Sequence, residues 1–228
     1  MAAEAACEPV REESVQPAVR GFVHRPAQPT GAGMVLTHGA GGNCQMLLLR
    51  ALAEEFAAHG WVVLRCDLPF RQARPQGPPS PSSAARDRDG LRRALEVIGK
   101  LAPGPLYLGG HSYGGRQGSM LAAEEPQIAR ALLLTSYPLH PPGKAAQLRV
   151  QHFPQLRIPV LFAIGTRDPF GTLEELATAR KLIPAPTSVA VVEDAGHDLG
   201  YGRKQASRDL PGRLWQAFSE LMEGIPSI

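Results

Sequence analysis

Ser112 is the central residue of a Gly-x-Ser-x-Gly pattern, which residues 110–114 (Gly-His-Ser-Tyr-Gly) form. The spacing alone is weak evidence, because the chain contains 24 glycines in 228 residues. Its context is informative: an apolar run, residues 105–108, precedes it, and a helix-forming stretch, residues 116–125, follows it. A serine on such a sharp strand-to-helix turn projects its hydroxyl from the end of a sheet. Ser112 is therefore the candidate nucleophile.

His197 is the candidate base. A serine hydroxyl is a poor nucleophile until a base takes its proton, and the base needs a carboxylate to hold its tautomer. His197 follows the β-rich run of residues 188–192, so it is expected just past a strand end.

Asp168 is the favoured partner for this histidine. It follows the buried apolar run of residues 160–164 and lies in a loop marked by glycine and proline. Asp194 and Asp198 are alternatives, because both lie close to His197 in the sequence. A carboxylate on the same short loop seldom reaches the far nitrogen of the imidazole, whereas one from a neighbouring strand end can. The chain order Ser, Asp, His, with each residue after a strand, is that of the α/β-hydrolases.

Two backbone N–H groups are also needed to stabilise the oxyanion of a tetrahedral intermediate. The residue after the nucleophile, Tyr113, is expected to supply one of them. The apolar run of residues 33–37 ends in the glycine-rich loop of residues 39–42, where a second donor is expected. Ala40 is the favoured second donor, and Gly41 is the alternative. This loop lacks the patterns of phosphate-binding loops.

The elements that position these residues alternate between strand and helix. Continuous apolar strands separated by helices predict a mostly parallel sheet with helices on both faces, an α/β fold whose site lies at the carboxyl ends of the strands. The predicted strands are residues 19–25, 33–37, 61–66, 106–109, 131–135, 160–164 and 188–192, and the predicted helices are residues 47–58, 87–101, 116–125, 173–182 and 210–222.

Two connections are longer than usual, and we expect them to frame the pocket without forming a full lid. They are residues 68–85, which are rich in proline, and residues 137–159. Arg71, Arg116 and Lys144 are candidates to receive an anionic group of a substrate, and Gly41 is a further candidate contact. The alternative is that these cations are merely solvated or bind carboxylates of the protein itself.

Several stretches of the chain resemble the small dienelactone-hydrolase-like α/β-hydrolases, and more narrowly a subgroup with testis-expressed hydrolase-like proteins and the hydrolase-like domain of a non-specific-lethal chromatin complex subunit. The resemblance covers about residues 19–222 and implies the α/β-hydrolase fold with a minimal lid or none. Dienelactone hydrolases proper use a cysteine where this chain has Ser112. The catalytic stretches are residues 36–42, 109–116 and 194–197, and the two that point to the subgroup are residues 68–74 and 136–144.

Composition predicts one globular domain, residues 19–228, after a loose N-terminal lead-in, residues 1–18. The formal net charge is +3, but the basic residues are spread out and no nucleic-acid motif is present, which argues against a nucleic-acid ligand. Three widely spaced cysteines favour a reducing compartment. Neither a signal-peptide core nor an apolar stretch long enough to span a bilayer is found, so we expect a cytoplasmic protein without a membrane partner.

No metal site or organic cofactor is implied, because the seven histidines show no paired ligand spacing and no Cys-x-x-Cys is present. The sequence therefore predicts a serine hydrolase that cleaves a small-molecule ester or related acyl compound through Ser112, His197 and Asp168. Two alternatives stay open, an acyltransferase with the same residues and a hydrolase-fold protein-interaction module without turnover. The oligomeric state is left open.

Overall fold

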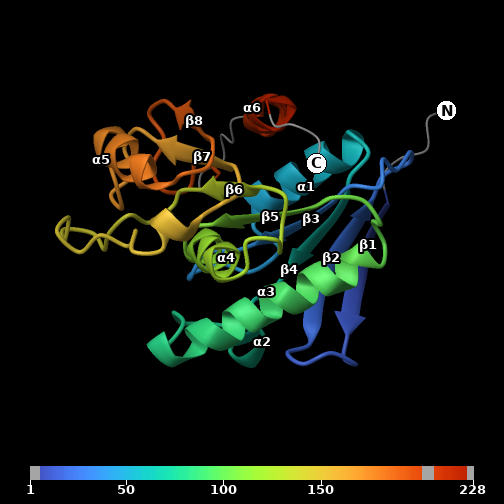
Figure 1. Cartoon of the computed structure of the whole chain (residues 1–228). Helices are drawn as coiled ribbons and strands as arrows, with labels where there is room; N and C mark the ends of the chain where they lie inside the picture. The colour runs from blue at the N-terminus through green and yellow to red at the C-terminus, as the bar shows by residue number, and fades with distance from the viewer. Residues whose placement is uncertain (1–5, 202–207, 225–228) are drawn as a thin grey trace.

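The computed structural model describes residues 6–201 and 208–224, and within them eight strands form one sheet in the order β1-β2-β4-β3-β5-β6-β7-β8 (Figure 1). The strands β1 and β2 are antiparallel to their neighbours, and the other six are parallel. Their bounds are β1 (Ala6–Glu12), β2 (Val19–Arg25), β3 (Gly33–Thr37), β4 (Val62–Cys66), β5 (Leu106–His111), β6 (Leu132–Thr135), β7 (Val160–Gly165) and β8 (Thr187–Val192).

Helices cover both faces of this sheet, which confirms the predicted α/β architecture. In Figure 1, α1 and α6 lie on one face, and α3 and α4 lie on the other. The helices are α1 (Leu47–Ala58), α2 (Pro69–Ala73), α3 (Ala84–Gly99), α4 (Tyr113–Glu124), α5 (Leu173–Ala179) and α6 (Leu210–Glu223), with three short 3-10 helices at Pro81–Ser83, Phe153–Gln155 and Arg180–Leu182. Among the helices of the described residues, none has the length and apolar character that crossing a bilayer requires.

The expectation of a loose lead-in over residues 1–18 is wrong for β1. This strand pairs with β2 along its whole length, from Ala6 opposite Arg25 to Glu12 opposite Val19. It escaped prediction because most of its side chains are exposed, so the strand shows no alternation of apolar and polar residues. Main-chain hydrogen bonds to β2 and charged pairs such as Arg25 with Glu8 hold it instead. Residues 1–5 lie outside the described part.

Two features of the connections also differ from the expectation. The proline-rich loop contains the short helix α2, which begins at Pro69, where a missing N–H costs nothing in the first turn. The predicted helix of residues 173–182 ends as an α-helix at Ala179 and continues as a 3-10 turn. Its start is set by a capping box, in which Thr172 and Glu175 each bond the other's backbone N–H.

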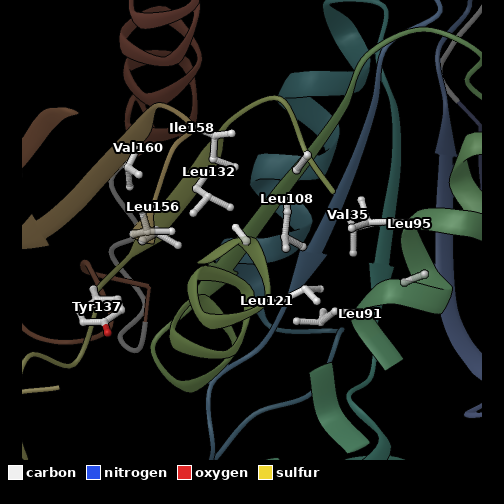
Figure 2. Packing of buried hydrophobic residues seen from close by; sticks show 14 of the residues in the cluster. Val35, Leu91, Leu95, Leu108, Leu121, Leu132, Tyr137, Leu156, Ile158 and Val160 are labelled. Atoms are coloured by element: carbon white, nitrogen blue, oxygen red, sulfur yellow. The ribbon is translucent and has the colours of Figure 1, made fainter. Parts of the chain in front are cut away.

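Hydrophobic side chains fill the space between the sheet and each helical layer. On the α3 and α4 face, Val35 and Leu108 of the sheet lie with Leu91 of α3 and Leu121 of α4 (Figure 2). On the opposite face, the ring of Phe56 of α1 lies edge-on to those of three other aromatic residues, Trp61, Trp215 and Phe218. The two layers bury both faces of the sheet.

The parallel strands all end at one edge of the sheet. Gly110 of β5 lies opposite Thr37 of β3, and Gly165 of β7 lies opposite Val192 of β8. The loops that follow these strands therefore meet at the same edge, where ligands of open α/β sheets bind.

Phe56→Ala tests the packing of α1 and α6 on the sheet. Phe56 is fully buried, so its loss leaves a cavity, and we expect the free energy of unfolding to fall by about 3–5 kcal/mol in urea denaturation. Leu47→Ala, at a position of the same helix that is 58% exposed, is the matched control and should change stability by less than about 0.5 kcal/mol. Similar losses in both variants would contradict this picture of the core.

Candidate active site

Ser112 lies on a sharp turn between β5 and α4, with φ of 51° and ψ of −116°. A non-glycine residue holds such a left-handed conformation only where the surroundings impose it. Two glycines allow the close packing that does so. A Cβ atom on Gly110 would lie 2.5 Å from the backbone N of Gly115, and one on Gly114 would lie 2.5 Å from the carbonyl oxygen of His38. The turn therefore requires glycine at both positions.

The imidazole of His197 lies between the hydroxyl of Ser112 and the carboxylate of Asp168. Its Nε2 is 2.8 Å from Ser112 Oγ, and its Nδ1 is 3.0 and 2.9 Å from the two oxygens of Asp168. The Asp168 side chain is only 1% exposed, and it also accepts the N–H of Phe170. These partners assign the imidazole proton to Nδ1, so that Nε2 accepts the serine hydroxyl.

The other two carboxylates considered for this role do not contact His197. Asp194 forms an exposed ion pair with Arg167, with Oδ1 and Nη2 2.6 Å apart. Asp198 accepts the backbone N–H of Gly200. Asp168 reaches the imidazole because it follows β7, the neighbour of β8, while His197 follows β8.

Unpaired backbone N–H groups lie beside Ser112. Within the described part of the chain, the N–H groups of Ala40, Gly41 and Tyr113 donate no hydrogen bond. Tyr113 is the first residue of α4, where helix N–H groups have no partner within the helix. The glycine-rich loop packs on the turn, since a Cβ on Gly39 would lie 3.2 Å from that of Ser112. The geometry brings both sequence candidates for the second donor, Ala40 and Gly41, to the site.

Arg71, one of the three cations that sequence analysis considered as a contact for a substrate anion, is bound by main-chain groups of the protein itself. It is 7% exposed, and its guanidinium donates to four backbone carbonyls. The loop between β3 and α1 supplies two of them, with distances of 2.8 Å to the oxygen of Gly42 and 2.7 Å to that of Ala40. The carbonyls of Arg74 and Gly77 accept the other bonds. Arg71 thus ties the glycine-rich loop to the proline-rich loop, a role invisible in sequence because its partners are main-chain atoms.

Asp87 is a second positioning residue that sequence analysis missed. It is fully buried in α3 and accepts the backbone N–H of Phe70 at 2.9 Å and the hydroxyl of Tyr113 at 2.8 Å. Burial, and next this hydrogen bond, raise the pKa of Tyr113, which therefore remains a donor. The sequence signal that could have revealed it was an acidic residue on the apolar face of the helix predicted for residues 87–101. A carboxylate buried on that face needs hydrogen-bond partners.

Two further histidines at this edge, His38 and His111, are neutral. Burial lowers the pKa of His38, whose Nδ1 donates to the Gly39 carbonyl and whose Nε2 accepts the N–H of Leu68. Burial, and to a smaller extent the neighbouring His197, lower the pKa of His111 to about 3. Neither ring therefore places a positive charge beside His197 at neutral pH.

An open cavity of about 1010 Å³ lies over Ser112 and His197. The two long connections frame it as expected, the first through residues 78–81 and the second through Pro138 and Arg149. Of the other candidate contacts, Arg116 and Gly41 line the cavity. Lys144 does not. It lies exposed in a turn of the second connection, because the chain turns outward between residues 141 and 147.

Within residues 6–201 and 208–224, no cluster of three or more histidine, cysteine or acidic side chains is arranged to hold a metal ion. The site instead consists of a hydroxyl, an imidazole and a carboxylate in one hydrogen-bonded chain.

A family model described as an alpha/beta hydrolase domain matches residues 30–225. The chain belongs to this alpha/beta hydrolase family. The match covers the six strands from β3 to β8, the turn at Ser112 and the loops that carry Asp168 and His197, so the fold and the general class of hydrolase apply to this protein.

Several solved structures share this fold. Dienelactone hydrolase from Anabaena variabilis is 17% identical, with a TM-score of 0.75, over 96% of this chain and 99% of that one. A serine hydrolase without a lid from Xanthomonas campestris is 18% identical, with a TM-score of 0.69, over 99% of both chains. The protein TT1662 from Thermus thermophilus is 23% identical, with a TM-score of 0.73, over 98% of this chain and 100% of that one. At these identities the likeness shows the fold alone.

Arg71→Ala tests the tie between the two loops. Four carbonyls lose their donor, so we expect the free energy of unfolding to fall by about 2–3 kcal/mol and the amides of residues 39–43 to exchange hydrogen faster. Arg74→Ala, which removes one exposed hydrogen bond to Pro78, is the matched control and should leave that exchange unchanged. Unaltered exchange of residues 39–43 in Arg71→Ala would rule out the tie.

His152, a half-buried histidine whose Nε2 lies 2.8 Å from the hydroxyl of Ser119, tests the cost of keeping such a ring neutral at low pH, through the variant His152→Gln. Burial lowers the pKa of His152 to about 4, so below its ordinary value near 6.5 the unfolded chain binds a proton that the folded chain does not. Wild-type stability should therefore fall as pH drops from 7 to 4, with His152 contributing about 3 kcal/mol. Urea unfolding across this range should show a shallower slope in the variant, and an unchanged slope would contradict the assignment.

Proposed function

We propose that this protein is a serine hydrolase that cleaves an ester or related acyl bond through Ser112, His197 and Asp168. The observation that carries the proposal is the continuous chain of hydrogen bonds from the Ser112 hydroxyl through His197 to the buried carboxylate of Asp168. A protein that only binds partners has no physical need for an activated hydroxyl at the floor of an open cavity.

In the acylation half of the reaction, His197 Nε2 accepts the proton of the Ser112 hydroxyl as Oγ attacks the acyl carbonyl. Asp168 stabilises the imidazolium that forms, through the two short contacts at Nδ1. The N–H of Tyr113 and that of Ala40, with Gly41 as the alternative, stabilise the oxyanion. His197 then gives its proton to the leaving alcohol, and the acyl group stays on Ser112.

In the second half, water attacks the acyl-enzyme while His197 takes a proton from it. Collapse of the tetrahedral intermediate releases the acid, and His197 returns the proton to Ser112. Removing one oxyanion donor from such a site typically costs about 100-fold or more in rate. Arg71 and Asp87 support these donors by holding the loop of Ala40 and the ring of Tyr113.

The pocket supports a small-molecule acyl substrate. It is framed by loops rather than by a separate lid, and nonpolar side chains such as Met46, Met120 and Phe170 line part of it. Transfer of the acyl group to an acceptor other than water uses the same residues, and an added alcohol that competes with water in product analysis would reveal it.

The test is labelling with a fluorophosphonate together with hydrolysis of a short p-nitrophenyl ester. We expect the wild type to be labelled and to turn over the ester, and Ser112→Ala to lose both. His197→Ala should lose about 10⁴-fold or more in kcat, because the hydroxyl is then not deprotonated. Asp194→Ala, at the exposed alternative acid, is the matched control for Asp168→Ala and should keep wild-type turnover. Equal labelling of the wild type and Ser112→Ala, or the absence of turnover that depends on His197, would contradict the serine-hydrolase proposal. The remaining alternative would then be a hydrolase-fold protein-interaction module.

A further inference from the structure

Two arginines that line the cavity have unpaired guanidinium groups. Across the described residues, Arg116 and Arg149 have neither an ion pair nor a side-chain hydrogen bond, and Arg116 Nε is buried without a partner. Most other arginines near the cavity are paired. Arg88, for example, contacts both Glu124 and Gln117, and Arg71 donates to four carbonyls. Burying a charged guanidinium without hydrogen-bond partners costs free energy. This indicates that a ligand supplies the missing partners.

A buried donor without an acceptor lies behind this wall, next to Arg116 in the chain. Gln117 is fully buried, and its Oε1 accepts a hydrogen bond from Arg88 at 3.1 Å. Its Nε2 is buried and has no partner. Because Arg88 donates to Oε1, the orientation of the Gln117 amide is fixed, and Nε2 is the atom left without a partner.

The main chain beneath these donors is held in place. Arg116 begins the hydrogen-bonding of α4, with its N–H 2.9 Å from the carbonyl oxygen of Ser112. One helical turn separates the two residues, a rise of about 6 Å along the helix. Arg149 is anchored at both ends, since its N–H donates to the carbonyl of Leu139 and its carbonyl accepts the hydroxyl of Tyr137 at 2.6 Å.

The charge on this wall is uncompensated. Among the described residues that line the cavity, none carries a carboxylate. Partial burial, and next the positive charge of Arg116, lower the pKa of Arg149. An anion bound between them relieves this repulsion and supplies the missing acceptors.

We propose that Arg116 and Arg149 form a subsite for an anionic group of the substrate, so that the protein acts on acyl compounds that carry a carboxylate or phosphate group. The planar guanidinium fork suits either group. This inference rests on the proposed function, because the reacting carbonyl must reach Ser112 while the anion lies on this wall.

The first experiment compares mono-p-nitrophenyl esters of succinate, glutarate and adipate with the methyl-capped neutral form of each. We expect the ratio of kcat/KM for the anionic over the neutral form to fall about tenfold to a hundredfold in Arg116→Gln and in Arg149→Gln, since each removes a charge-assisted hydrogen bond. The loss should lie mainly in KM. Lys144→Gln removes the same charge from the same connection, outside the cavity, and should keep the wild-type ratio. Equal ratios in all four proteins, with hydrolysis still dependent on Ser112, would overturn the subsite and leave the proposed function standing.

The second experiment measures binding without turnover. Ser112→Ala is titrated calorimetrically with monomethyl glutarate and, separately, with inorganic phosphate. We expect at least one anion to bind, and to bind at least tenfold more weakly when Arg149→Gln is added. The stronger of the two identifies carboxylate or phosphate as the group recognised. If neither anion binds, or if binding is unaffected by Arg149→Gln, the subsite is wrong whatever the outcome of the labelling experiment.

Discussion

The site depends on the close approach of three backbone segments at the end of β5. The turn at Ser112, the first turn of α4 and the loop after β3 touch through atoms that leave no space for a side chain at Gly110 or Gly114. This contact keeps Ser112 in its left-handed conformation and brings the loop of Ala40 beside the hydroxyl. The parallel sheet does the rest, because β7 and β8 end at the same edge and bring Asp168 and His197 within hydrogen-bonding distance.

Buried polar side chains hold the surrounding loops by bonding to main-chain groups. Arg71 bonds carbonyls of two loops, Asp87 bonds the start of α2 and the hydroxyl of Tyr113, and His38 bridges Gly39 and Leu68. A buried polar group is stable only when it is hydrogen-bonded, so each of these residues has its partners. Against that background the unpaired guanidiniums of Arg116 and Arg149 differ from the rest of the site and mark the wall that is left for a ligand.

Helices and strands with buried apolar side chains were predicted more accurately from the sequence than exposed ones. The bounds of α1, β2 and β3 were predicted to the residue, because buried apolar stretches and glycine-marked ends are readable along the chain. The edge strand β1 was missed because its exposed side chains carry no such pattern. Arg71 was kept as one candidate for a substrate anion, because an arginine near a predicted site looks the same in sequence whether it meets an anion or a carbonyl.

The sequence by itself determined the α/β fold and the identity of a serine, a histidine and three candidate acids at strand ends, because periodicity, glycine spacing and chain order are local properties. Only the tertiary structure selected Asp168 over Asp194 and Asp198 as the partner of the imidazole. Only the tertiary structure, too, decided that Arg71 bonds main-chain carbonyls while Arg149 lines the cavity. These outcomes depend on which strands are neighbours and on which main-chain atoms a side chain meets. Both are set by contacts between residues far apart along the chain, and hydrogen-bond geometry over a few ångströms decides them.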